Sequence, residues 1–401
     1  MDGSADALPG FSAGSSSTWI AQQQVDDMAQ IRHLDAAVIG GGQAGLAVGY
    51  FLAQQQRNFA ILDARARVGD AWRTRWDGLR LFTPGRLNAL PGMPFPGDPH
   101  GFPTKDDAAD YLEAYATAMD LPVRTGVRVN DVWPADDGSG FRIVTDDGDY
   151  EAGQVVVATG AYDRPRVPDF AGELDPAIVQ MHSSQFRSTS QLGDGAVLVV
   201  GASNSGAEIA LMAAHEHQTV LVGREVGKMP FRPEDRLART FDTFFWFFVN
   251  HVATLDNPIG RKAAPGIRDH GLPLDRVRPS DLNAAGVERV HARTVGVSDG
   301  RPLLDDGRVI EAANVVWATG FRPDHEWIHV PITGHDGWPR QTRGVVTEVP
   351  GLFFIGLPFM YAGASALLGG VGRDAAYLVR QMALQAADRM SPTGQETATA
   401  N

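Results

Sequence analysis

The sequence predicts an α/β protein built from two similar units, each a mostly parallel sheet with helices packed on its faces. Two observations support this prediction. A short apolar strand runs into a glycine turn and then into a helix twice, at 36–47 and at 196–209. The ending Ala-Thr-Gly also follows a β-branched apolar strand twice, at 158–160 and at 318–320. Because a repeated strand, glycine turn and helix is typical of Rossmann-like dinucleotide-binding domains, we expect two of them.

The first glycine turn has the pattern GxGxxG. Gly40 permits the tight turn, Gly42 lets a pyrophosphate approach the backbone, and Gly45 lets helix and strand pack closely. The helix N-terminus then faces the phosphates. The next strand, 59–62, delivers Asp63 at the spacing at which an acid accepts hydrogen bonds from an adenosine ribose. The predicted site also includes Gln43, Ala44 and Ala64.

The second glycine turn keeps the first and last glycines of the pattern, Gly201 and Gly206, and has Ser203 in the middle. Serine is small enough to allow close approach of a ligand to the backbone. The following strand, 219–222, leads to Arg224 where the first unit has its acid. An arginine there would pair with a 2′-phosphate and select NADPH over NADH, and a solvated surface arginine is the alternative. Asn204 and Ser205 complete this predicted site. The acid suits FAD in the first unit, and the arginine suits NADPH in the second.

The stretch between the two turns contains two further predicted features. After Gly69 comes a loop with Trp72 and Trp76, then a short strand at 79–82. These tryptophans either line a flat ring or belong to the core. A helix opened by Thr104 as N-cap follows, with apolar residues at helical spacing at Ala108, Tyr111, Leu112 and Tyr115.

Short strands at 127–132, 141–145 and 155–158 then predict an antiparallel meander, containing Val129, that returns to a parallel sheet. A last buried strand at 352–357 contains Gly356, which we expect to meet the first cofactor.

These elements predict a discontinuous FAD-binding domain over 33–165 and 310–390, and an NADPH-binding domain over 166–309. An aromatic-rich insertion at about 228–283 contains the run 241–248, which predicts a buried element, a wall of a substrate funnel, or a patch for a membrane or partner. The polar segments 1–32 and 391–401 are predicted to be a disordered tail and a frayed end.

Composition excludes several classes of function. The chain of 401 residues has 35 basic and 48 acidic residues, which argues against nucleic acid or an anionic membrane as the main partner. It contains no cysteine, so disulfides, thiolate metal sites and a catalytic dithiol are excluded. Its eleven histidines show no metal-ligand spacing, and no metal site is expected. We see no secretory signal and no apolar run of membrane-spanning length, so a cytoplasmic protein is expected, with homo-oligomerisation left open.

In combination, the motifs resemble those of class B flavoprotein monooxygenases, in particular flavin-containing monooxygenases and YUCCA-type enzymes. The resemblance covers about 36–382 and rests on both glycine turns, Gly69 with Trp72, the helix entry at 102–105, both Ala-Thr-Gly endings and the 367–369 ending. The family fingerprint FxGxxxHxxx(F/Y/W) is present in stretched form, at Phe170, Gly172, His182 and Phe186, with six residues added before the histidine. In the family this segment links the cofactor domains, so His182 is expected to be a hinge residue or a hydrogen-bonded structural histidine.

The resemblance implies hydride transfer from NADPH to the flavin N5, then addition of O2 to give a C4a-(hydro)peroxyflavin that oxygenates a small organic substrate. Phe186 in place of tryptophan favours heteroatom oxygenation or oxidative decarboxylation over Baeyer–Villiger chemistry. The candidate catalytic residues are Thr83, which stands where the family often has an asparagine, and Asn204, whereas Asn88 lies farther along the chain. The further cofactor-binding residues expected are Trp72, Val129, Thr159, Gly160, Ala318, Thr319, Gly320 and Gly356.

Two other functions remain open from the residues alone. A flavoprotein reductase without a dithiol, which passes electrons to another acceptor, would use both glycine turns. A non-catalytic nucleotide-binding or redox-sensing module would also need at least one of them.

Overall fold

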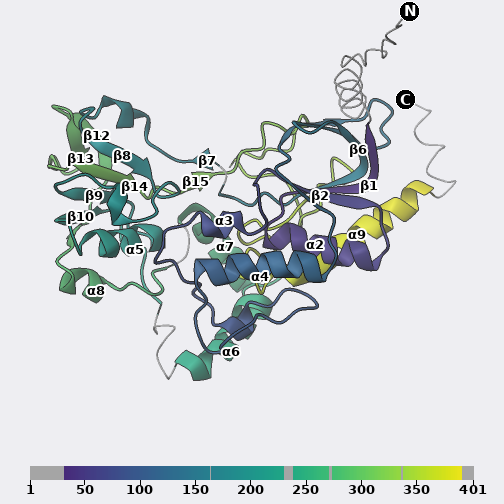
Figure 1. The fold of residues 1–401 in the computed structure, drawn as a ribbon, viewed down its shortest axis with the longest axis horizontal. Helices are drawn as coiled ribbons and strands as arrows, with labels where there is room; N and C mark the ends of the chain where they lie inside the picture. Colours follow the sequence, from purple (N-terminus) through teal and green to yellow (C-terminus); the bar gives the residue numbers. More distant parts are fainter. Residues whose placement is uncertain (1–30, 163, 230–237, 271–272, 336, 391–401) are drawn as a thin grey trace, which may run out of the picture.

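The computed structural model describes residues 31–162, 164–229, 238–270, 273–335 and 337–390. They form two units that lie side by side (Figure 1). One unit contains β1, β2, β6, α2, α4 and α9, and the other contains β9, β10, β14 and α5. The α/β fold with two Rossmann-like units is therefore confirmed.

The first sheet has seven strands in the order β3-β2-β1-β6-β5-β4, with β16 also paired to β6. Its parallel strands are β1 (Arg32–Ile39), β2 (Phe59–Asp63), β3 (Val123–Thr125), β6 (Tyr150–Val157) and β16 (Leu352–Phe354). The strands β4 (Val129–Pro134) and β5 (Phe141–Thr145) are antiparallel and lead into β6, which confirms the predicted meander. Ile39 pairs with Leu62 on one side and with Val157 on the other, so β1, β2 and β6 end at the same edge.

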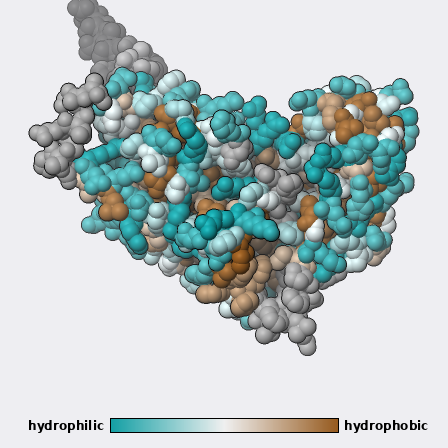
Figure 2. Space-filling model, turned by 180° about the vertical axis from the view of Figure 1, so that it is seen from behind, coloured by the Kyte–Doolittle hydropathy of each residue, from teal (hydrophilic) through white to brown (hydrophobic). Residues whose placement is uncertain are grey.

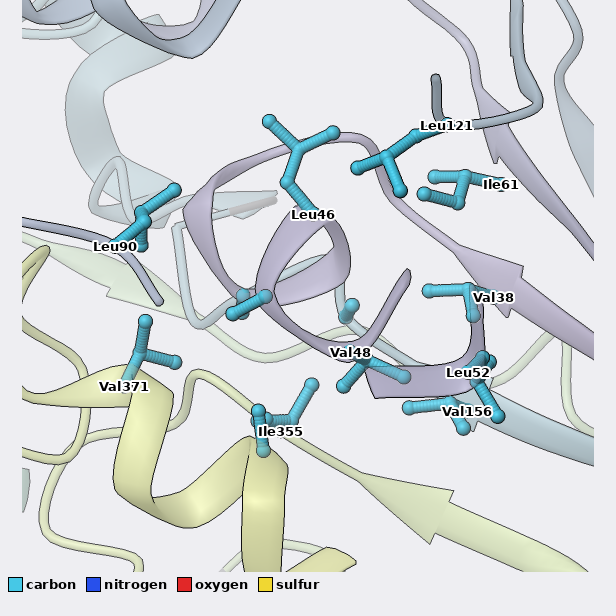
Figure 3. Packing of buried hydrophobic residues seen from close by; sticks show 14 of the residues in the cluster. Val38, Leu46, Val48, Leu52, Ile61, Leu90, Leu121, Val156, Ile355 and Val371 are labelled. Atoms are coloured by element: carbon cyan, nitrogen blue, oxygen red, sulfur yellow. The ribbon is translucent and has the colours of Figure 1, made fainter. Parts of the chain in front are cut away.

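Helices α2 (Gln43–Gln54), α4 (Lys105–Ala118) and α9 (Val371–Met390) pack around one hydrophobic core. Figure 3 shows side chains of α2 gathered with Val38 and Val156 of the sheet and Val371 of α9. As predicted, Thr104 caps α4, in a capping box with Asp107. The four residues predicted at helical spacing on α4 are all buried.

The second sheet has five parallel strands in the order β11-β10-β9-β14-β8. They are β8 (Val179–His182), β9 (Val197–Val200), β10 (Thr219–Val222), β11 (Glu288–Val290) and β14 (Asn314–Trp317). Helices α5 (Asn204–Ala213) and α8 (Pro279–Ala284) and the hairpin of β12 (Thr294–Ser298) and β13 (Arg301–Leu304) pack against it. Short 3-10 helices lie at Gly85–Leu87 (η1), Asp169–Glu173 (η2) and Thr189–Gln191 (η3).

The chain crosses between the two units at β7 (Arg164–Pro165) and returns at β15 (Phe321–Arg322), and these two strands pair antiparallel. The two crossings therefore lie side by side (Figure 1). The domain boundary at 165 stays a prediction, and the boundary predicted at 310 is corrected because β14 (Asn314–Trp317) still belongs to the second sheet. β14 lies between β9 and β8 in the second sheet. Each Ala-Thr-Gly ending therefore follows a strand of its own unit.

The aromatic-rich insertion forms α6 (Ala238–Phe247), a π-helical turn η4 (Phe248–Val252) and α7 (Pro258–His270). It packs on the loop between β16 and α9: Leu255 N donates to Tyr361 O (2.8 Å), and Gly363 N donates to Ala253 O (3.0 Å). The prediction that the 241–248 run is buried is wrong for Phe244, which is 67% exposed, and for Phe245 and Phe247, which are also exposed. In Figure 2 hydrophobic surface lies at the lower end of the molecule, the end at which Figure 1 shows α6. Among the described helices none combines the length and the hydropathy that a membrane crossing needs.

Three local predictions need correction. The strand predicted at 79–82 is reduced to an isolated bridge between Arg80 and Thr104, because the facing segment contains Pro103, which has no N–H to donate. Part of the loop predicted before it is the short helix α3 (Asp70–Arg73). The tail predicted over 1–32 ends earlier, since Arg32 pairs with Tyr150 in the sheet and donates to its hydroxyl (2.8 Å). Residues 1–30 of that tail and the segment 391–401 lie outside the described residues.

Candidate functional site

The first glycine turn is shaped by backbone contacts that only glycine allows. Gly40 has φ +110°, and a Cβ there would lie 2.6 Å from the carbonyl oxygen of Ala158. A Cβ at Gly45 would overlap the carbonyl oxygen of Gly40. These two glycines are therefore required by the packing of α2 against β1 and β6.

Gly42 differs from its neighbours because the fold itself does not require a glycine there. It is the N-cap of α2, with φ −77° and ψ −174°, a region open to any residue. A Cβ at this position would meet no atom within 4 Å. The glycine thus keeps open space directly in front of the helix N-terminus, where a phosphate is favoured. This geometry fits the pyrophosphate of a dinucleotide, with Gln43 and Ala44 forming the first turn of the helix.

Asp63 is fixed against this turn at the end of β2. Its Oδ2 accepts from Gly41 N (3.0 Å), and its Oδ1 accepts from Arg65 N (2.9 Å). A carboxylate oxygen can accept a second hydrogen bond, so the site retains acceptors for a ribose. The main chain of Val127 donates to Asp63 O (3.0 Å), and Val129, two residues farther along, begins β4 and pairs with Thr145 of β5.

Three more predicted residues lie at this edge. Thr159 follows β6, and its Oγ1 is buried and has no hydrogen-bond partner within the described part of the chain. An orphaned buried hydroxyl beside the turn fits a site that a ligand completes. Gly356 follows β16 with φ +79°, and a Cβ there would lie 2.8 Å from the Cβ of Ala44. Gly160, the next residue after Thr159, has φ +83°.

The second glycine turn repeats this geometry. Gly201 has φ +111°, and a Cβ there would overlap the carbonyl oxygen of Ala318; a Cβ at Gly206 would overlap that of Gly201. Ser203 caps α5 with φ −81° and ψ −175°, almost the conformation of Gly42. Serine is therefore accommodated without strain, and Ser205 lies in the first turn of α5.

The two units differ in the residues that follow their second strands. Val200 pairs with Val222, so Gly223 occupies the position of Asp63, and Arg224 lies one residue farther, at the position of Ala64. This corrects the expected one-to-one exchange of acid for arginine. A Cβ at Gly223 would lie 2.6 Å from Ala202 N, so an acid is excluded there. Arg224 is exposed, and within the described residues we find no ion pair for it.

The structure shows how the remaining predicted residues of the second unit are held. Asn204 Oδ1 accepts from Asp275 N (3.0 Å), and its Nδ2 donates to Pro273 O (3.1 Å), which ties α5 to the segment that follows α7. Thr319 donates through its hydroxyl to Arg166 O, at the crossing between units. Gly320, with φ +81°, accepts from His182. The catalytic role of Asn204 stays a prediction.

His182 is a hydrogen-bonded structural histidine at the crossing. Its Nε2 lies 3.0 Å from Gly320 O, which can only accept, so the proton is on Nε2. Its Nδ1 accepts from Ser184 N (3.1 Å). Burial lowers the pKa of His182, which keeps the ring neutral.

The residues around Thr83 were only partly predicted. Thr83 Oγ1 donates to Asn88 Oδ1 (2.6 Å), and Asn88 Nδ2 donates back to Thr83 O (2.9 Å). Asn88 is 1% exposed. The 3-10 turn at Gly85–Leu87 folds the chain back, so Asn88, which the spacing suggested was too distant, lies against Thr83. Trp72 is half-buried and packs on the core under α4, and Trp76 is buried in the second unit.

A cavity of about 150 Å³ lies between α7, the 338–341 segment and the chain just after Gly356. Its lining residues, which sequence reasoning missed, are Arg268, Trp338, Pro339, Arg340, Gln341, Leu357 and Pro358. Arg268 Nη2 donates to Phe359 O (2.9 Å) and so attaches the insertion to this loop. Among the described residues no cluster of three or more metal-ligating side chains occurs.

Known proteins with this arrangement include flavin-containing monooxygenases. Residues 37–240 match the family model described as pyridine nucleotide-disulphide oxidoreductase. An uncharacterized CzcO-like oxidoreductase from Geobacillus kaustophilus is 41% identical over 351 residues, covering 87% of this chain and 98% of that protein. The indole-3-pyruvate monooxygenase YUCCA1 of Oryza sativa is 37% identical, over 44% of each chain.

Solved structures agree with these sequence matches. The flavin-containing monooxygenase from Stenotrophomonas maltophilia matches with a TM-score of 0.71 and 27% identity, covering 88% of this chain and 99% of that chain. A bacillithiol disulfide reductase from Bacillus cereus, 18% identical with a TM-score of 0.64, shares the fold. The chain belongs to the pyridine nucleotide-disulphide oxidoreductase family, in the branch that contains the class B flavoprotein monooxygenases.

Proposed function

We propose that this protein is an FAD-dependent, NADPH-using monooxygenase that forms a C4a-(hydro)peroxyflavin and transfers one oxygen atom of O2 to a small organic substrate. The observation that supports it most is the duplicated glycine turn. Both turns have the same backbone geometry, but Asp63 follows the first and Gly223 with Arg224 follows the second. Two different dinucleotides are therefore favoured.

The residues assign a role to each unit. Gly42 and the N-terminus of α2 would hold the FAD pyrophosphate, Asp63 the adenosine ribose, and Thr159 would donate its free hydroxyl. Ser203 and α5 would hold the NADPH pyrophosphate, with Arg224 at the 2′-phosphate. When both are bound, the nicotinamide supplies a hydride and the flavin supplies the oxygen chemistry. The protein itself binds, orients and excludes water, which agrees with the neutral, hydrogen-bonded state of His182.

The absence of cysteine from the 401 residues supports an electron acceptor other than a disulfide. Oxygen or a separate acceptor remains. The fingerprint residue Phe186, which is fully buried beside Trp76, and the close similarity to flavin-containing monooxygenases favour oxygen. A reductase that passes electrons to another acceptor is the alternative. The cytoplasmic location and the reaction type expected from the sequence stay predictions.

The proposal is tested on the purified protein. We expect bound oxidised FAD, faster oxidation of NADPH than of NADH, and, on mixing the NADPH-reduced protein with O2, an absorbance distinct from both oxidised and reduced flavin. Rapid return to oxidised flavin without such a species, with fast turnover on artificial acceptors, would establish the reductase instead. A colourless protein that binds no FAD would refute both.

A further inference from the structure

One hydrogen bond joins the two units directly beside the second glycine turn. Trp76 comes from the chain that continues the first unit, yet its indole packs in the core of the second unit with Phe186 and Ala207. Its Nε1 donates to Glu208 Oε2 (2.9 Å). Glu208 lies on α5, four residues after Asn204, where that helix begins.

The segment 76–81, which we name the bridge segment, is attached at both ends. Toward the second unit, Asp77 N donates to Arg187 O (2.9 Å), and Gly78 lies against the Met212 side chain of α5. Toward the first unit, Leu79 O accepts from Lys105 N (3.1 Å) at the start of α4, and Leu81 N donates to Pro103 O (2.8 Å). The bridge segment therefore spans from the helix of the second glycine turn to the helix α4.

The bridge segment also leads directly to the polar pair Thr83 and Asn88. One residue separates Leu81 from Thr83, whose hydroxyl is bonded to the buried Asn88 amide. A shift of α5 relative to the first unit would thus be transmitted through Trp76 to this pair. The same shift would move the nucleotide held at the N-terminus of α5.

Glu208 is held at this position at an energetic cost, because burial disfavours its charged form. Glu208 is partly buried, and burial raises its pKa. The Trp76 N–H and the positive charge of Arg276 act in the opposite direction. An apolar side chain at 208 would avoid this desolvation but would leave the buried indole N–H without an acceptor.

We propose that Glu208 is a positioning residue: by holding Trp76, it fixes the second glycine turn relative to Thr83 and so sets the approach of the nicotinamide to the flavin. This inference rests on the proposed function. Since a displacement of about 1 Å can cost on the order of 100-fold in rate, a single interdomain bond is enough to matter.

The test compares Trp76→Phe, which keeps an aromatic ring of smaller size and removes the N–H, with Glu208→Gln, which keeps an acceptor oxygen. Flavin reduction by NADPH is followed without oxygen, and reduction by dithionite, which needs no nicotinamide, is followed in parallel. We expect Trp76→Phe to slow the NADPH reaction by about 10-fold, and Glu208→Gln by less than about threefold. Dithionite rates and FAD content stay at the wild-type level. Trp133→Phe, at a surface tryptophan that is 46% exposed, is the matched control.

A second measurement reports on the bridge without turnover. Hydrogen exchange of the purified protein should quicken in Trp76→Phe both at 76–81 and at α5, because each loses the same anchor. Equal rates of flavin reduction by NADPH in Trp76→Phe and in the wild type overturn the proposal. Loss of FAD or of the dithionite reaction in Trp76→Phe also overturns it, because either result would indicate a purely structural role. If wild-type protein is not reduced by NADPH, the proposed function fails, and exchange confined to 76–81 would separately refute the bridge.

Discussion

The open space beside Gly42 provides the sharpest test of the first glycine turn. In Gly42→Ala the added methyl group meets no atom within 4 Å, and the backbone angles suit alanine. The fold should lose only helix-capping energy, about 1 kcal/mol. If the FAD pyrophosphate lies against this backbone, the methyl group occupies its place. We therefore expect the affinity for FAD to fall by at least about 10-fold, or about 1.4 kcal/mol.

Gly45→Ala separates a ligand effect from a packing effect. Its methyl group would overlap the backbone carbonyl of Gly40, which no side-chain rotation can relieve. We expect a loss of about 3 kcal/mol or more in unfolding free energy, at the upper end of overpacking costs. FAD retained per chain after gel filtration and the midpoint of urea unfolding measure the two effects. Wild-type FAD affinity in Gly42→Ala would refute the pyrophosphate assignment, and wild-type stability in Gly45→Ala would refute the packing argument.

Three further predictions follow from single side chains. Arg224→Gln should raise the KM for NADPH by about 10-fold and leave that for NADH unchanged, since it removes only a charge for the 2′-phosphate; equal effects in steady-state assays with both nucleotides would place that phosphate elsewhere. Burial lowers the pKa of His325 in the folded protein to about 4, whereas its pKa in the unfolded chain is about 6.5. Between these two pH values the unfolded chain takes up a proton at His325 and the folded protein does not. The unfolding free energy should therefore fall by about 3 kcal/mol as the pH is lowered to 4. His325→Phe should remove most of that slope in denaturant unfolding at several pH values, and an unchanged slope contradicts the assignment. Thr104→Ala should lower the unfolding free energy by about 1 kcal/mol, because Asp107 N loses its acceptor, and a calorimetric change below the error would contradict this.

The features predicted correctly from the sequence are those fixed by local spacing. The two glycine turns, the Thr104 cap and the meander each depend on residues close together in the chain, where turn geometry and strand period act directly. The predicted strand at 79–82 failed because a strand also needs a partner with free N–H groups, and Pro103 supplies none.

The missed features depend on contacts between distant segments. Trp76 meets Glu208 across 132 residues, and the insertion contacts Tyr361 about a hundred residues later. No period or motif in the sequence marks these pairs. The small distance between Thr83 and Asn88 was also missed, although Pro84 and Gly85 between them are residues typical of a turn.

The two glycine turns differ in a steric way that would let one fold distinguish two nucleotides. In the first unit Asp63, at the end of the second strand, faces Gly41. In the second unit Gly223 faces Ala202 in the same way. Each of these two pairs has room for only one side chain. In the first unit the glycine is at 41, so the acid fits and accepts from the backbone N–H of Gly41 (3.0 Å). In the second unit Ala202 occupies that space, so the chain has glycine at 223. A carboxylate near a 2′-phosphate would repel that phosphate. In the second unit the methyl group of Ala202 leaves no room for a carboxylate side chain at position 223, and Arg224 would add an attraction for the phosphate. Preference for the phosphorylated nucleotide would thus begin with the exclusion of the acid.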